Sequence, residues 1–142
     1  MKKGILIAAL ALAFGLGAGA MESHAAVDTS EVYTLVNDYR VANGLPELTI
    51  DTNMQTASEI RATEAAQLWS HTRPDGSEWW TVDASVYGEN LGYGYSSARE
   101  LVDNWIASPS HNRNLLEAKY STVCVAVVNI NGVEYVAQEF GR

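Results

Sequence analysis

Apolar residues near the start of the polar part of the chain recur at helical spacing. They fall three or four positions apart, which places them on one face of a helix. Asp28 followed by Glu31 resembles an acidic capping box at the beginning of this stretch. Asn43-Gly44 suits the left-handed end of a helix, so a first helix is predicted between these signals. Its apolar stripe consists of Val32, Leu35, Val36 and Tyr39.

A second helix is predicted from a cap at Asp51 or Thr52 to about Leu68. Its alanines allow another layer to approach closely, and its packed side consists of Met54, Ala57, Ala62, Ala65, Ala66 and Trp69. Arg61 and Glu64 are three residues apart and can pair on one face. We interpret them as a solvated surface pair.

A third helix is predicted from the capping box formed by Ser97 and Glu100. Pro109 should end it near Ser108, because proline disfavours helical geometry at the preceding residue. The same two residues can open a short helix, with Ser108 as cap and Pro109 at the first position. That helix would carry His111 in its first turn. The apolar stripe of the third helix consists of Ala98, Leu101, Val102 and Trp105.

The end of the chain has the pattern of a β-hairpin. Strands Thr122–Ile130 and Val133–Phe140 flank Asn131-Gly132, the pair that a two-residue type I′ turn prefers. A shorter strand is predicted at Glu89–Tyr93. Both alternating sets of side chains are apolar along Val123–Val128, which predicts a strand covered on both faces. The fold class is therefore α+β, a three-layer αβα sandwich with a small antiparallel sheet between helices.

The first 25 residues have the layout of a secretory signal peptide. A basic start is followed by an uncharged run from Gly4 to Ala20, and small residues at Ser23 and Ala25 suit cleavage after Ala25. A retained membrane helix is the alternative, although the run is short for a bilayer core of roughly 30 Å. We predict a signal peptide at 1–25, a single domain at 26–142, no membrane span after cleavage, and a secreted, extracellular protein.

The charge and the cysteine content narrow the choice of partners. The formal net charge is −8, so the surface should repel phosphate backbones, and we expect no nucleic-acid partner. Cys124 is the single cysteine, so no disulfide can form within the chain. It lies in an apolar strand pattern, which predicts a buried, inert thiol.

Candidate chemistry gathers in three polar stretches. His71 lies in the turn-rich segment Ser70–Gly76, His111 lies near the start of the predicted short helix, and Glu89-Asn90 supplies a carboxylate. A helix N-terminus disfavours a cation, so His111 should be neutral, the form that accepts a proton or binds a metal. Two neutral histidines and one carboxylate would match a zinc-type set with an open position. The compact metal-binding spacings are absent, however, so spacing alone supports this reading only weakly.

Hydrolysis is a second possibility for the same residues. Glu89 with either histidine could act as a general base and its orienting partner for a water molecule. Ser108 and Ser110 lie close to His111, but the chain has no G-x-S-x-G elbow, and capping already accounts for Ser108. A structural polar cluster without a ligand is a third possibility.

The same residues resemble motifs of the CAP superfamily (cysteine-rich secretory, antigen-five and pathogenesis-related proteins, also called SCP domains), in its bacterial secreted form. The resemblance extends over roughly Glu31 to Gly141. The matching pieces stand in family order: Asn37–Arg40 with Leu45 and Leu48, Ser70–Gly76, Gly88–Leu91, Trp105 with Ser108–His111, Asn114–Leu116, and Tyr135, Gln138 and Phe140.

This resemblance implies an αβα sandwich with a His/Glu cleft that binds a divalent metal such as zinc in several relatives. By position, His71, Glu89 and His111 would be its metal ligands. Many relatives have a second glutamate where this chain has Ser108, so the usual set of four is incomplete. Relatives have been linked to sterol or lipid binding, metal binding, signalling to hosts and, occasionally, proteolysis.

Our leading hypothesis is a secreted CAP-domain binding or interaction module. Its cleft would be formed by His71, Glu89 and His111 with Ser108 and Asn90, and would take a divalent metal such as zinc or a small ligand. A lipid or an extracellular protein is also a possible partner. The rival is a metal-assisted hydrolase acting on peptides or cell-wall material, with Glu89 as the base.

Overall fold

The computed structural model describes residues 25–142. The predicted signal peptide, apart from Ala25, lies outside the described residues. Within the described range, no helix combines the length and the apolar character needed to cross a membrane.

The predicted helices are present, with bounds close to those expected. The Asp28 carboxylate caps the first helix by accepting the backbone N–H of Ser30 at 2.8 Å. The second helix begins with a 3-10 turn, which Asp51 caps through the N–H of Asn53. The helical elements are α1 (Thr29–Ala42), η1 (Thr52–Met54), α2 (Gln55–Gln67), η2 (Trp79–Val82), α3 (Ala98–Ala107) and α4 (Pro109–Leu115).

The sheet has four strands in the order β1-β3-β4-β2. β3 and β4 form the predicted hairpin, and Asn131 and Gly132 both have positive φ, at 52° and 83°, as a type I′ turn requires. The strands are β1 (Thr49–Ile50), β2 (Gly88–Tyr93), β3 (Thr122–Ile130) and β4 (Val133–Gly141).

The sheet is mixed, whereas the sequence predicted an antiparallel one. The three longer strands pair antiparallel with one another, but β1 runs parallel to β3, with Thr49 beside Thr122 and Ile50 beside Val123. A strand of two residues is too short to carry an alternating pattern, so no local signal predicted β1.

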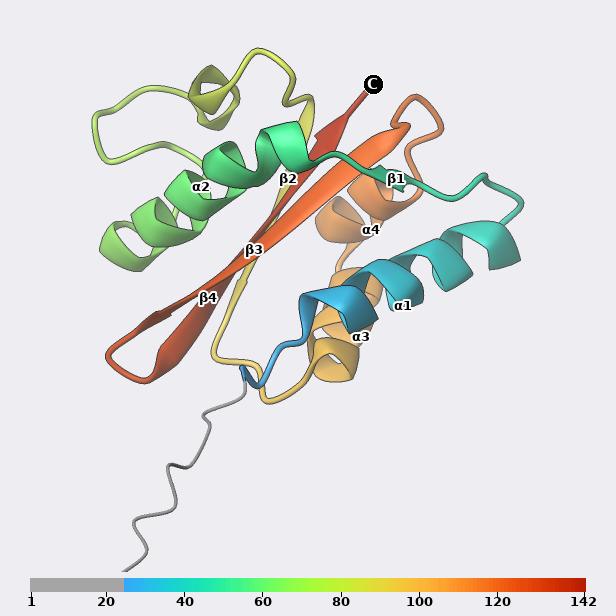
Figure 1. The fold of residues 1–142 in the computed structure, drawn as a ribbon, viewed down its shortest axis with the longest axis horizontal. Helices are drawn as coiled ribbons and strands as arrows, with labels where there is room; N and C mark the ends of the chain where they lie inside the picture. The colour runs from blue at the N-terminus through green and yellow to red at the C-terminus, as the bar shows by residue number, and fades with distance from the viewer. Residues whose placement is uncertain (1–24) are drawn as a thin grey trace, which may run out of the picture.

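Helices cover both faces of this sheet (Figure 1). α2 packs on one face, and α1, α3 and α4 pack on the other. Alternate residues of β3 serve the two layers, since Val125 belongs to the core under α1 and α3 while Cys124 packs beside Met54 at the start of α2. The three-layer sandwich is confirmed, as is the prediction that β3 is covered on both sides.

Successive side chains of β2 likewise point to opposite faces of the sheet and enter two different polar clusters. Glu89 faces α2, where it meets Arg61, and Asn90 faces α4, where it meets Asn114. The next residue, Leu91, accepts a hydrogen bond from the buried indole of Trp105 at 2.9 Å. β2 is therefore clamped between the layers, which fixes the position of both polar side chains.

Candidate functional site

His71 is positioned by a tight turn that follows α2. Within this segment, Gly76 has a φ of 86°, and its N–H donates to the carbonyl of Arg73 at 2.9 Å. Thr72 and Glu78 then form an isolated antiparallel bridge. The segment is closed on itself, so the His71 ring projects from a fixed base although its side chain is 53% exposed.

Glu89 lies beneath the His71 ring. Its side chain is only 1% exposed, and its Oε1 lies 2.8 Å from Nδ1 of His71. Arg61 donates to the same carboxylate from Nε at 2.7 Å and from Nη2 at 3.0 Å. Burial raises the pKa of Glu89, but the hydrogen bonds from His71 and Arg61 outweigh it and hold the pKa below its usual value. Glu89 is therefore an ionised acceptor with both oxygens engaged.

Arg61 is the centre of this buried network, and sequence reasoning misplaced it. It pairs with Glu64 at 2.6 Å as predicted, but its side chain is fully buried rather than solvated. A further N–H reaches the carbonyl of Ser70 at 3.0 Å, in the turn that carries His71. Glu64 in turn accepts from Arg73 of the same turn at 2.8 Å. Arg61 thus joins α2, β2 and the His71 turn.

A second carboxyl group, on Glu139 of β4, lies beside Glu89. The two residues are direct cross-strand partners, and Glu139 is fully buried. Burial first, and then the charge of Glu89, raise the pKa of Glu139 well above its ordinary value. Neither of its oxygens has a hydrogen-bond partner among the described residues. The raised pKa favours the neutral acid of Glu139, and Arg61 balances the charge of Glu89.

His111 is held from the other side of the sheet by α4. Its Nδ1 lies 2.8 Å from Oγ of Ser108, and Asn90 donates to its backbone carbonyl at 3.3 Å. Asn90 is itself fixed, because it donates to Gln138 at 3.1 Å and accepts from Asn114 at 3.0 Å. Burial, and then the nearby charge of His71, lower the pKa of His111. The expectation of a neutral His111 therefore has physical support.

Ser108 has a role that the sequence did not predict. It is the N-cap residue of α4 by position, but its side chain makes no capping hydrogen bond. Its hydroxyl instead contacts the His111 ring, one turn along the helix. Ser108 therefore orients His111, and the capping explanation for its side chain is wrong.

The two imidazoles face one cavity of about 330 Å³. Glu89 and Asn90 lie behind the cavity wall, and Ser108 lies beside His111. Nδ1 of each ring is engaged, which leaves the two Nε2 atoms without a partner among the described residues. The cavity is lined by Trp69, Ser70, His71, Leu91, Ser110 and His111.

Sequence reasoning missed Trp69, whose ring forms part of the cavity wall. Its side chain is half exposed and packs edge to face against Tyr93, with ring centroids 4.6 Å apart. The helical pattern had assigned Trp69 to the packed side of the second helix. α2 instead ends at Gln67, so Trp69 lies beyond the helix and lines the cavity.

The residues fit only part of the zinc-type ligand set. No three His, Cys, Asp or Glu side chains of residues 25–142 lie close enough together to share an ion. Glu89 is turned toward Arg61 and His71, and both of its oxygens already take part in hydrogen bonds with them. His71 and His111 present free nitrogens to the same space, and these two are the donors that a metal could use.

Comparisons with known proteins agree with this fold. The sequence profile of the CAP family, described as the cysteine-rich secretory protein family, matches residues 33–140. No curated protein matches the chain by sequence. An outer surface protein from Borrelia burgdorferi has a similar structure, with a TM-score of 0.69 and 21% identity, over 81% of this chain and 95% of that one.

Two further solved structures contain the same sandwich. One is an extracellular protein with an SCP domain from Bacillus anthracis, with a TM-score of 0.72 and 21% identity over 80% of this chain and 39% of that one. The other is a cysteine-rich secretory protein from Staphylococcus aureus, with a TM-score of 0.62 and 20% identity over 80% of this chain and 38% of that one. This chain spans less than half the length of these two proteins. At such identities, the structures share its fold.

The fold is therefore that of a small αβα sandwich domain. Its polar cavity lies between the turn that follows α2, the strand β2 and the short helix α4. The CAP profile covers well over half of the chain. The chain therefore belongs to the CAP family.

Proposed function

We propose that this CAP domain is a secreted binding module whose ligand is held by Nε2 of His71 and Nε2 of His111. The observation that carries the proposal is the pairing of two imidazoles across one cavity, each with its Nδ1 already engaged. The predicted signal peptide and the naming of the Bacillus relative as an extracellular protein support secretion.

The carboxylate of Glu89 prepares His71 for this role. An ionised carboxylate can only accept hydrogen bonds, so Glu89 favours the His71 tautomer that has the proton on Nδ1 and the lone pair on Nε2. In metal sites such a partner orients the ring and raises its basicity. Arg61 keeps Glu89 ionised and in place. The arrangement suits a ligand that accepts electron pairs, and a divalent cation such as zinc is the simplest one.

The remaining contacts of the ligand would come from the cavity wall. Ser70 and Ser110 supply polar groups, and Trp69 and Leu91 supply apolar surface. A cation held by two histidines would keep positions open for water or for a group of a small molecule, a lipid or an extracellular protein partner. Binding, rather than turnover, is the function that this geometry supports best.

In this structure, the hydrolase alternative requires a general base other than Glu89. Glu89 lies behind His71 with both oxygens engaged, so it has no free oxygen to take a proton from a water molecule in the cavity. If the cleft activated water, Nε2 of His71 would accept the proton and Glu89 would stabilise the resulting charge. Two serines, Ser70 and Ser110, line the cavity among the described residues. Neither lies in the strand-to-helix turn that presents a serine nucleophile to a histidine.

Zinc titration of the secreted protein by calorimetry tests the proposal. His71→Ala and His111→Ala should each weaken zinc binding by about tenfold or more, since each removes one of two donor nitrogens. Ser121→Ala, at an exposed position outside the cavity, is the control and should bind as the parent does. A panel of peptides and peptidoglycan fragments should show no turnover with or without zinc. Zinc binding that survives both histidine substitutions, or metal-dependent turnover, would contradict the proposal.

A further inference from the structure

A second hollow, of about 580 Å³, lies at the opposite edge of the sheet from the histidine cleft. The cleft adjoins β2, the last strand in the sheet order, whereas this hollow adjoins β3 beyond the short strand β1. The N-terminal part of α1 borders it on one side and the start of α2 on the other. Its lining includes Val27, Tyr33, Ile50, Gln55, Val125 and Val127.

The hollow exists because β1 leaves the sheet after two residues. The N–H of Asp51 still donates to the carbonyl of Val123 at 3.0 Å, so the backbone of Val123 is turned toward this edge. The chain then turns into η1 and α2. From Val125 onward, β3 has a neighbouring strand on only one side, namely β4.

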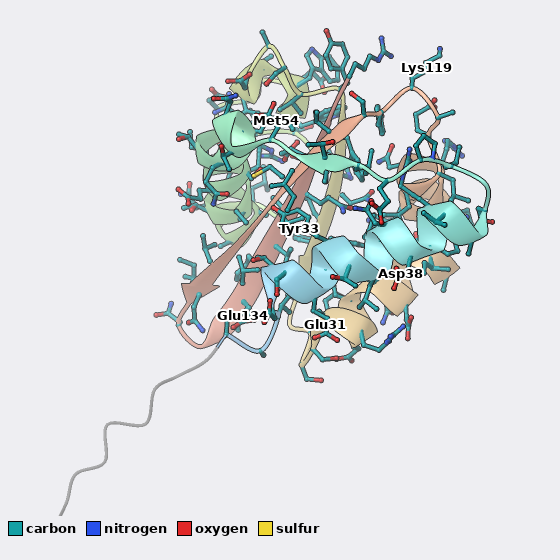
Figure 2. The ribbon with its side chains drawn as sticks, turned by 45° about the vertical axis from the view of Figure 1, so that its right-hand side comes forward. Glu31, Tyr33, Asp38, Met54, Lys119 and Glu134 are labelled. Atoms are coloured by element: carbon teal, nitrogen blue, oxygen red, sulfur yellow. The ribbon has the colours of Figure 1, made fainter. Side chains whose placement is uncertain are left out.

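The open edge presents backbone groups in the spacing of a strand. Successive residues of a strand turn their N–H and C=O groups to opposite sides, so Val125 and Val127 face the same edge as Val123. The hydroxyl of Tyr33, which extends from α1, accepts the N–H of Val125 at 2.8 Å (Figure 2). The C=O of Val125 and both backbone groups of Val127 have no hydrogen-bond partner among the described residues.

Beyond the Tyr33 hydroxyl at Val125, this edge lacks the usual protection against pairing. Proteins commonly block open edges with prolines, charged side chains or bulges. The stretch Val125–Val128 contains none of these, and it continues the β3–β4 ladder without a break. α1 and α2 border the hollow on its two sides, so there is room for one added strand rather than for a second sheet. The space and the free backbone groups therefore match a single extended polypeptide.

We propose that this groove, the β3-edge groove, binds one extended peptide strand of a partner protein, which continues the line of β1. Backbone hydrogen bonds to Val125 and Val127 would supply affinity, as in other cases of strand addition. The lining includes the carboxylate of Asp28 and no lysine, arginine or histidine. The chain as a whole carries a net charge of −8. The partner segment is therefore β-prone and carries a basic residue that faces Asp28.

Amide hydrogen exchange tests this proposal on the secreted protein. The probe is a blocked hexapeptide of alternating valine and threonine with a lysine at each end, used at about 1 mM, where weak binding is still measurable. In the free protein, the Val127 amide should exchange rapidly, because it has no acceptor. The peptide should slow this exchange by about tenfold or more. Versions of the peptide methylated on alternate backbone nitrogens provide the control, and one of the two should have no effect.

Val127→Pro is the variant that separates binding from folding. The Val127 N–H faces the open edge, so proline there removes a docking donor without removing a bond to β4. Because proline has no amide proton, the readout in this variant is the peptide-induced NMR shift of the neighbouring Ala126 and Val128 amides. The variant should keep its fold and lose these shifts, whereas His71→Ala should keep both the shifts and the slowed exchange of Val127. Asp28→Asn, which retains a capping side chain, should weaken the effect. Unchanged exchange of Val127 with peptide would overturn the proposal. So would protection that appears without peptide and rises with protein concentration, which would indicate a second copy of the chain.

Discussion

Arg61→Met is expected to lower the free energy of unfolding by about 3–5 kcal/mol, the usual cost of removing one partner of a buried ion pair. Methionine keeps much of the volume but leaves the Glu89 carboxylate buried without its counter-ion, beside the acid of Glu139. The turn that carries His71 also loses the donor to its Ser70 carbonyl. Chemical denaturation measures the loss, and zinc affinity should fall with it.

Two comparisons identify the cause of this loss. Arg99→Met changes an exposed arginine on α3 and should stay within about 0.5 kcal/mol of the parent. Adding Glu89→Gln to Arg61→Met removes the stranded charge, so the double variant should lose less than the sum of the two single losses. If the two losses were additive, or if Arg61→Met cost less than about 1 kcal/mol, the buried ionic network would not have the role described above.

Glu139→Gln is expected to change how stability depends on pH. Burial raises the pKa of Glu139 in the folded protein above its ordinary value of 4.5. Below that ordinary value the group is protonated in both states and makes no difference to stability. As the pH rises further, the unfolded chain loses the proton while the folded chain keeps it. Stability should then fall by up to about 1.4 kcal/mol per pH unit until the folded pKa is passed.

A neutral glutamine removes this loss. Relative to the parent, Glu139→Gln should therefore become progressively more stable between acidic and neutral pH, with little difference at the acidic end. Glu47→Gln, which changes an exposed loop residue, is the matched control and should run parallel to the parent. A parallel curve for Glu139→Gln itself would mean that Glu139 is ionised in the folded state. Denaturation curves across this pH range give the answer.

The elements that the sequence predicted well are those with strong local signals. The capping residue Asp28, the Asn131-Gly132 turn and the doubly apolar strand β3 each specify structure within a few residues. β1 could not be predicted, because its two residues form a strand only by pairing with β3, more than 70 residues later in the chain. The parallel pair in the sheet follows from that long-range contact.

In the candidate site, too, local patterns identified some residues but not the long-range contacts between them. His71 and His111 were singled out from their polar surroundings, and the structure places both rings at one cavity. The sequence assigned Glu89 to the ligand set, but its neighbour Arg61 turns it away from the cavity. That contact joins residues 28 positions apart, and the helical pattern of α2 alone gave Arg61 a solvated position. Partners of buried charged side chains come from tertiary packing, which local patterns do not encode.

The protonation of the two rings is the feature on which the binding role depends. Long-range proton–nitrogen NMR spectra of the labelled protein, recorded near pH 8 where unperturbed imidazoles are neutral, distinguish protonated from unprotonated ring nitrogens. In His71, whose Nδ1 faces the Glu89 carboxylate, we expect a proton on Nδ1 and a free lone pair on Nε2, and zinc should shift the Nε2 signals of both rings. A proton on Nε2 of His71, or zinc-induced shifts confined to one histidine, would rule out the proposed site.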